Sequence, residues 1–100
     1  MIDLNAIQAI DNDRRLKILE WLKHPKTHFR PQVDGDLVKD GVCAALLAEK
    51  LDISQPTLSE HMRVLIAAKL VKAKRIKQWT MYSRDEDAIA TIKRVIHDKV

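Results

Sequence analysis

Residues 47–65 read LAEKLDISQPTLSEHMRVL and hold two helix-forming segments separated by a short break. Small Ala48 lets two helices cross closely, and Ile53 stands where a side chain fills the turn between them. Asp52 precedes it, and aspartate tolerates the left-handed backbone that such a turn often needs. Apolar side chains at helical spacing predict the buried face of the second helix: Leu58, Met62 and Leu65. The stretch is typical of a helix-turn-helix.

The opposite face of this second helix is polar near its N-terminus. Its short hydrogen-bonding and charged side chains are Ser54, Gln55, Thr57, Ser59, Glu60, His61 and Arg63. Such side chains suit the reading of base edges in the DNA major groove, and a helix N-terminus also offers free N–H groups to a phosphate. Gln55 is able to pair with adenine. Glu60 either accepts from a cytosine amino group or repels phosphate, while His61 lies toward the buried side, where packing or phosphate contact is an alternative to base reading.

A basic β-hairpin is predicted directly after this helix. Residues 70–75 alternate apolar and basic side chains, and residues 78–83 are rich in strand-forming types, with Trp79 and Tyr82 expected in the hairpin core. Segment 61–84 holds seven basic residues and no acidic one, while the remaining chain holds 11 basic and 14 acidic residues. A solvated charged face is the simple explanation of such a run, but beside a helix-turn-helix the run favours a polyanionic partner. The expected phosphate contacts are Lys72, Lys74, Arg75 and Lys77.

The remaining elements are placed by apolar periodicity and capping residues. Helices are expected over 4–10, from an Asn12 or Asp13 cap until Pro25, over 42–51 after a cap at Asp40, over 54–69, and over 85–98. Residues 24–40 contain two prolines and an Asp-Gly turn signal, so they are expected to form an irregular loop that is functional, docked or mobile. The prediction is one α+β, mainly helical domain over residues 1–100, a winged helix-turn-helix with five helices and a two-stranded β-hairpin wing.

Three stretches resemble the ArsR/SmtB family of bacterial winged-helix repressors: DNDRRLKILEWL (11–22), the stretch 47–65, and LVKAKRIKQWTMYSR (70–84). The resemblance implies a homodimer built by the first and last helices. It also implies two recognition helices in successive major grooves of a pseudo-palindromic operator, and repression relieved by a small-molecule or ion inducer. Independently, apolar stripes near both ends of this small domain suit two-fold pairing: Leu4, Ile7, Ile10, Ile89, Ile92, Val95 and Ile96.

The metal sites of that family are poorly matched here. Cys43, the single cysteine, aligns with the first residue of the family's Cys-x-Cys pair, but Ala45 occupies the second position. The family's other site, on the last helix, would use residues that are out of register: Asp85, Asp87, His97 and Asp98. No metal or other cofactor is therefore predicted. A metal- or thiol-responsive sensor that combines Cys43 with His24 and His28 stays as an alternative.

Other classes of protein are disfavoured by what the chain lacks. There is no Gly-rich phosphate loop, nucleophile elbow or acid–base pair, so an enzyme is not expected. No apolar run reaches the roughly 20 residues that cross a membrane, and the first ten residues carry no basic leader, so a cytoplasmic location is expected. The rival is a winged-helix module for protein assembly, which predicts a wing poor in charge. The basic hairpin favours double-stranded DNA instead.

Overall fold

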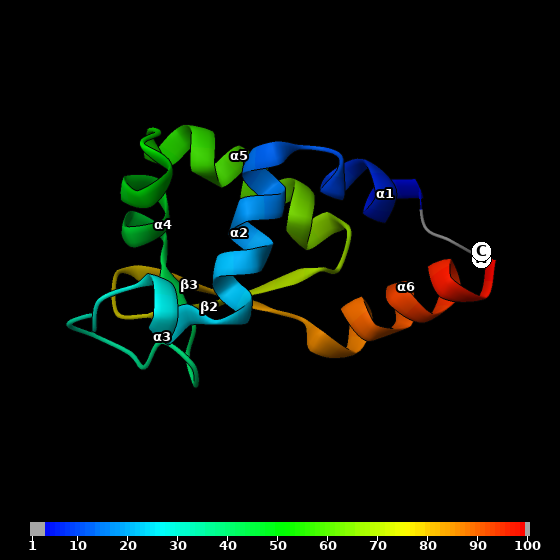
Figure 1. Ribbon diagram of the computed structural model, residues 1–100. Helices are drawn as coiled ribbons and strands as arrows, with labels where there is room; N and C mark the ends of the chain where they lie inside the picture. The colour runs from blue at the N-terminus through cyan, green and yellow to red at the C-terminus, as the bar shows by residue number, and fades with distance from the viewer. Residues whose placement is uncertain (1–3, 100) are drawn as a thin grey trace.

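A computed structural model of the protein describes residues 4–99 and, within them, the side chains of residues 6–94. The elements along the chain are α1 (Leu4–Ile10), α2 (Asp13–Lys23), α3 (Pro25–His28), β1 (Val42–Cys43), α4 (Ala44–Leu51), α5 (Gln55–Ala67), β2 (Val71–Ile76), β3 (Trp79–Arg84) and α6 (Glu86–Lys99). Figure 1 shows α2 in the middle of the molecule, with the hairpin turn at one end and α1 and α6 at the other. No helix in the described part of the chain is both long and apolar enough for a membrane span.

The helix-turn-helix forms as predicted from α4 and α5. Asp52 ends α4 in the left-handed conformation at φ 56°, and the Ser54 side chain caps α5 by accepting from the Thr57 N–H. Pro56 lies in the first turn, where the N–H that it lacks would have no helical partner. The predicted buried face of α5 is confirmed, because Leu58, Met62 and Leu65 are fully buried.

The sheet has three strands rather than the two that were predicted. Strand β1 pairs antiparallel with β3, with Val42 opposite Tyr82 and Cys43 opposite Met81, and β3 pairs in turn with β2. The predicted helix over 42–51 therefore begins two residues later, at Ala44. The prediction of a cap at Asp40 is wrong as well, since the N-cap is Cys43 and makes no side-chain cap bond.

The hairpin of β2 and β3 turns through Lys77 and Gln78, between the paired residues Ile76 and Trp79. Lys77 has φ 53°, a conformation that is uncommon for a residue with a side chain. The turn carries neither Gly nor Asn, which is why its type was not evident from the sequence. We refer to β2, β3 and this turn as the wing.

Residues 24–40 are docked on the protein and are not wholly irregular. The short helix α3 follows α2 directly and starts at Pro25, a residue suited to a first helical position. Phe29 and Leu37 are buried, and Phe29 meets Trp21 edge to face with ring centroids 6.3 Å apart. Asp36 closes a turn by accepting from the N–H groups of Val38 and Lys39 at 3.0 and 2.7 Å. Of the three alternatives left open for this loop, docking is the one that the contacts support.

The core lies where α2 and α5 meet β3. Its fully buried large side chains are Val42, Ile18, Leu47, Leu58, Met62, Leu65 and Met81. Arg84 ties the end of β3 to α2 by donating to the Leu19 carbonyl at 3.1 Å, and it pairs with Glu86 at 2.7 Å. Helix α6 then leads away from this core (Figure 1), which contributes to the elongated shape of 43 × 25 × 22 Å.

Candidate nucleic-acid interface

The N-terminal half of α5 presents polar side chains to solvent. The exposed ones are Ser54, Gln55, Thr57, Ser59, Glu60 and Arg63, while His61 is half-buried. The Ser54 hydroxyl donates to Thr57 Oγ1 at 3.0 Å, so these two side chains are already joined. Gln55 and Ser59 make no side-chain hydrogen bond within the described part of the chain. Their amide and hydroxyl groups are therefore available to a partner, as a base-reading role requires.

Glu60 and Arg63 form an exposed two-pronged ion pair, one helical turn apart. Arg63 Nη2 donates to Glu60 Oε1 at 2.6 Å, and Arg63 Nε donates to Glu60 Oε2 at 3.1 Å. The hydrogen bond and charge of Arg63 lower the pKa of Glu60, and Glu60 likewise raises the pKa of Arg63. Because an exposed ion pair contributes little to stability, DNA can open it at small cost.

His61 is held by Arg15, a residue that sequence reasoning did not single out. Arg15 Nη1 lies 3.2 Å from His61 Nδ1. Arg15 Nε donates to the Ala9 carbonyl at 2.6 Å, and Arg15 Nη2 donates to the Gln8 carbonyl at 3.3 Å. Arginine has no acceptor, so His61 Nδ1 is the acceptor and its proton sits on Nε2. Burial lowers the pKa of His61, and the charges of Arg15 and Arg14 lower it further. This geometry favours the packing role of His61, and it links α5 to the end of α1.

All four basic residues predicted for the wing are exposed: Lys72, Lys74, Arg75 and Lys77. Two of them are paired with aspartates from the loop that precedes β1. Lys74 Nζ lies 2.6 Å from Asp40 Oδ1, and Lys77 Nζ lies 3.0 Å from Asp34 Oδ1. Across the described residues, Lys72 and Arg75 make no ion pair. No local pattern marks the loop partners, because they are 34 and 43 positions away from the lysines that they meet.

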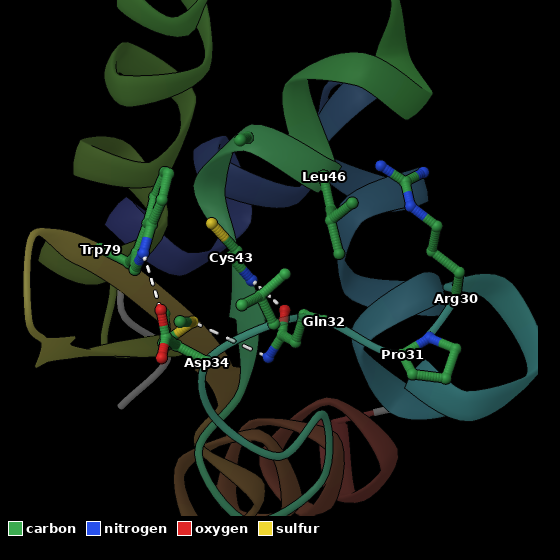
Figure 2. A pocket seen from close by; sticks show the side chains of 10 residues that line it. Arg30, Pro31, Gln32, Asp34, Cys43, Leu46 and Trp79 are labelled. Atoms are coloured by element: carbon green, nitrogen blue, oxygen red, sulfur yellow. Dashed lines mark hydrogen bonds between the residues drawn. The ribbon is translucent and has the colours of Figure 1, made fainter.

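Trp79 and Tyr82 were both expected in the hairpin core, and only Tyr82 lies there. Tyr82 is 8% exposed and its burial raises the pKa of its hydroxyl. Trp79 is 37% exposed and donates its Nε1–H to Asp34 Oδ2 at 3.1 Å, so it faces the loop (Figure 2).

Cys43, His24 and His28 are not brought together. Cys43 is buried and donates its N–H to Gln32 Oε1 at 3.0 Å, whereas the His28 ring lies 6.5 Å from the ring of Trp21. Among the residues that the structure describes, no group of three or more His, Cys, Asp or Glu side chains is arranged to hold a metal ion. Asp85 instead accepts from the Ala88 N–H at the start of α6. The side chains of His97 and Asp98 lie outside the described residues.

The predicted dimer stripes differ in how much apolar surface they leave open. Ile7 is 40% exposed, Ile10 and Ile92 are half-buried, and Ile89 is buried within the chain's own fold. The side chains of Leu4, Val95 and Ile96 lie outside the described residues. Sequence reasoning missed two further exposed apolar side chains on described helices, Leu16 on α2 and Ile66 on α5.

Comparisons with known proteins agree with this architecture. The family model for bacterial regulatory proteins of the arsR family matches residues 42–73. The HTH-type transcriptional regulator YbzH of Bacillus subtilis (strain 168) is 40% identical over 92 residues, which are 92% of each chain. The nodulation protein NolR of Rhizobium meliloti is 32% identical over 92% of this chain, which spans 63% of that relative.

The fold is shared with solved structures of low sequence identity. The homodimeric winged helix-turn-helix DNA-binding domain of Mb0332 from Mycobacterium bovis superimposes with a TM-score of 0.66 at 21% identity, over 96% of this chain and 78% of that one. The similarity extends over almost the whole chain, so the predicted resemblance is confirmed by both sequence and fold. The chain belongs to the ArsR family of bacterial regulatory proteins and is a DNA-binding transcriptional regulator with a winged helix-turn-helix.

Proposed function

We propose that the protein is a homodimeric repressor that binds a pseudo-palindromic operator and is released from it by a signal. The observation that carries this proposal is the juxtaposition of two surfaces. The N-terminal half of α5 exposes free polar groups such as those of Gln55 and Ser59. The wing, whose strand β2 contacts α5, exposes four basic side chains. The first surface suits base edges and the second suits phosphates.

Two-fold symmetry is supported by the apolar surface on α1 and α2. Ile7 and Leu16 are 40% and 48% exposed, so a partner that packs on them would bury this apolar area. The winged helix-turn-helix domain of Mb0332, which shares this fold, is homodimeric. A dimer would place two copies of α5 on half-sites about one helical turn of DNA apart.

Repression follows from occupancy, since a bound dimer blocks access to the promoter. A small-molecule or ion inducer acts only if it binds the DNA-free protein more tightly than the DNA-bound protein, by about 1–3 kcal/mol. We propose the docked loop as the place to search for its site. There, a hollow of about 220 Å³ opens between the loop, α4 and β3, and Pro31, Leu46 and Trp79 contribute to its wall (Figure 2).

The test is selection of binding sites from random duplex DNA, with the mass of the free protein measured by light scattering. An enriched inverted repeat together with a dimer mass supports the proposal. A transcription assay with that repeat in the promoter then distinguishes repression from activation. A monomer mass, or binding that shows no sequence preference, contradicts the proposed mechanism.

A matched pair of variants tests the role of α5. Gln55→Ala is expected to relax the preference at one base pair by roughly 1–3 kcal/mol while leaving affinity for random DNA nearly unchanged. Lys50→Ala, on α4 with its ammonium over the Trp21 ring, is the control for removing an exposed side chain elsewhere in the motif. Equal losses on operator and random DNA for Gln55→Ala would remove this residue from base reading.

A further inference from the structure

The segment 30–41, which joins α3 to β1, lies against the wing and brings two carboxylates to it. Asp40 Oδ1 is 2.6 Å from Lys74 Nζ, and Asp34 Oδ1 is 3.0 Å from Lys77 Nζ. Both lysines belong to the surface that the proposed function assigns to phosphate. Half of the four exposed basic side chains on the wing are therefore already paired with an acid of the same chain.

These carboxylates are fixed in place, whereas the lysines reach into solvent. Asp34 uses its second oxygen to accept from Trp79 Nε1 at 3.1 Å, and Asp40 uses its second oxygen to accept from the Asp36 N–H at 2.8 Å. The aspartate side chains are 21% and 15% exposed, while those of Lys77 and Lys74 are 68% and 55% exposed. A phosphate can attract the ammonium groups away, but the carboxylates stay behind.

The segment itself is anchored to the sheet. Gln32 donates to the Gly41 carbonyl at 2.7 Å. It also accepts from the Cys43 N–H at 3.0 Å (Figure 2). The backbone at Gly35 runs so close to the wing that an added Cβ would lie 3.1 Å from Ile76 Cδ1. The hydrogen bond from Lys74 and, to a smaller extent, the hydrogen bond from the Asp36 N–H lower the pKa of Asp40. This carboxyl group is therefore ionised at neutral pH.

We propose that Asp34 and Asp40 limit the affinity of the wing for the DNA backbone by competing with phosphate for Lys77 and Lys74. The inference rests on the proposed role of the wing. In this role, the two aspartates act on DNA binding only through the lysines that they hold, and they contact no base. Their effect is uniform over DNA sequences, because phosphate contacts carry no direct sequence information.

The test compares the wild-type protein with the double variant Asp34→Asn, Asp40→Asn. Asparagine keeps an oxygen acceptor for Trp79 and the Asp36 N–H but removes the charge. Affinity for a random duplex and for the selected operator is measured by fluorescence anisotropy between about 50 and 200 mM salt. We expect binding of both duplexes to tighten about threefold to tenfold at 0.1 M salt, and the slope of log affinity against log salt to steepen by about 1 to 2.

The control is the double variant Glu20→Gln, Asp87→Asn, which changes the net charge equally at exposed positions on α2 and α6. We expect its affinity to change less than twofold. An aspartate variant that keeps the wild-type thermal transition but binds no more tightly than this control would overturn the proposal. Tighter binding of the control by the same factor would also overturn it, because net charge alone would then explain the gain.

A second comparison does not depend on the stability of the aspartate variant. With both loop aspartates unchanged, two double variants are compared. We expect the double variant Lys74→Ala, Lys77→Ala to flatten the slope of log affinity against log salt less than the double variant Lys72→Ala, Arg75→Ala. The reason is that only Lys74 and Lys77 are opposed by carboxylates. If both double variants flatten the slope equally, the inference is overturned, but the wing still contacts DNA. A slope unchanged by either pair removes the wing from the interface, and the proposed function then fails with it.

Discussion

At the scale of single residues, Arg15 links α1 to α5 through one guanidinium group. It donates to the carbonyls of Ala9 and Gln8 at the end of α1 and meets His61 Nδ1 on α5 at 3.2 Å. The contact requires a neutral imidazole, because a protonated ring has no acceptor and repels the cation. The position of α5 relative to α1 therefore depends on the charge of His61.

This dependence predicts a loss of stability in mild acid. The pKa of His61 is lowered in the folded protein by burial and by Arg15 and Arg14, while Glu60 raises it weakly. The unfolded chain therefore binds a proton more readily, and the folded state loses stability as the pH falls through the unfolded value of about 6.5 toward the lower folded value. Above about pH 7 His61 contributes no pH dependence.

The variant His61→Gln isolates this contribution, since its amide oxygen can accept from Arg15 without titrating. Thermal transitions of both proteins are measured at several pH values between about 5 and 8. We expect wild-type stability to fall relative to that of the variant as the pH decreases below about 6.5. Parallel curves would show that His61 does not couple proton binding to folding. Acidic groups with lowered pKa values, such as Glu49, titrate in both proteins and cancel in the difference.

Residue-scale features were predictable only where their cause is local. The Asn12 and Ser54 caps accept from N–H groups three positions away, and the left-handed Asp52 ends its own helix. A short window of sequence contains both partners in each case. Arg15 and His61 are 46 positions apart, and an arginine in a charged stretch is ordinarily a solvated side chain, so no sequence signal marked this contact.

At the scale of elements, β1 shows how a short strand depends on distant backbone. Its two residues have no strand pattern of their own, and they pair only because β3 lies beside them. Gly41 permits the backbone before β1 to lie close to the backbone of β3. It has φ +109°, and an added Cβ would lie 2.5 Å from the Tyr82 carbonyl oxygen. A backbone atom cannot move aside as a flexible side chain can.

We therefore expect Gly41→Ala to destabilise the protein by about 2 kcal/mol or more, through both strain at positive φ and the clash with β3. Urea denaturation followed by circular dichroism measures the change. Gly35→Ala is the control, because φ is also positive there at +81° but the nearest atoms belong to the side chains of Ile76 and Met81. A smaller loss for Gly41→Ala than for Gly35→Ala would show that the β1–β3 approach does not limit stability.

The elements that periodicity did not predict are short ones whose formation depends on neighbouring parts of the chain. The periodicity of the chain predicted α4, α5, the wing strands and α6 to within two residues at each end. It did not predict β1 or α3, which are two and four residues long and follow from contacts with β3 and from the proline after α2. The wing lysines were correctly expected at the surface, but their pairing with Asp34 and Asp40 depends on how the loop docks. The tertiary fold determines that docking.

At the scale of the whole molecule, the protomer is elongated, with α1 and α6 at the end opposite the hairpin turn (Figure 1). The apolar stripes of these helices were predicted from spacing alone, but spacing does not say which members face the protomer's own core. Ile89 does so, and Ile7 does not. Leu16 on α2 adds exposed apolar area of the kind that dimers cover.

Assembly and DNA binding are linked in the proposed dimer. If the proposed dimer covers α1 and α2, the double variant Ile7→Gln, Leu16→Gln shifts the solution mass toward the monomer without changing charge. Each protomer keeps its α5 and wing, so we expect affinity for random DNA to change little. Affinity for an inverted repeat should fall by about a hundredfold, because two half-sites are no longer held at a high effective concentration.

Val38→Gln is the matched control, since Val38 is 59% exposed and lies on the docked loop rather than on α1 or α2. Light scattering over a range of protein concentrations and anisotropy with whole and half operators supply the two readouts. A dimer mass that survives the double variant would place the interface elsewhere. A monomer that still prefers the whole operator over the half-site would mean that two protomers cooperate through the DNA rather than through their apolar surfaces.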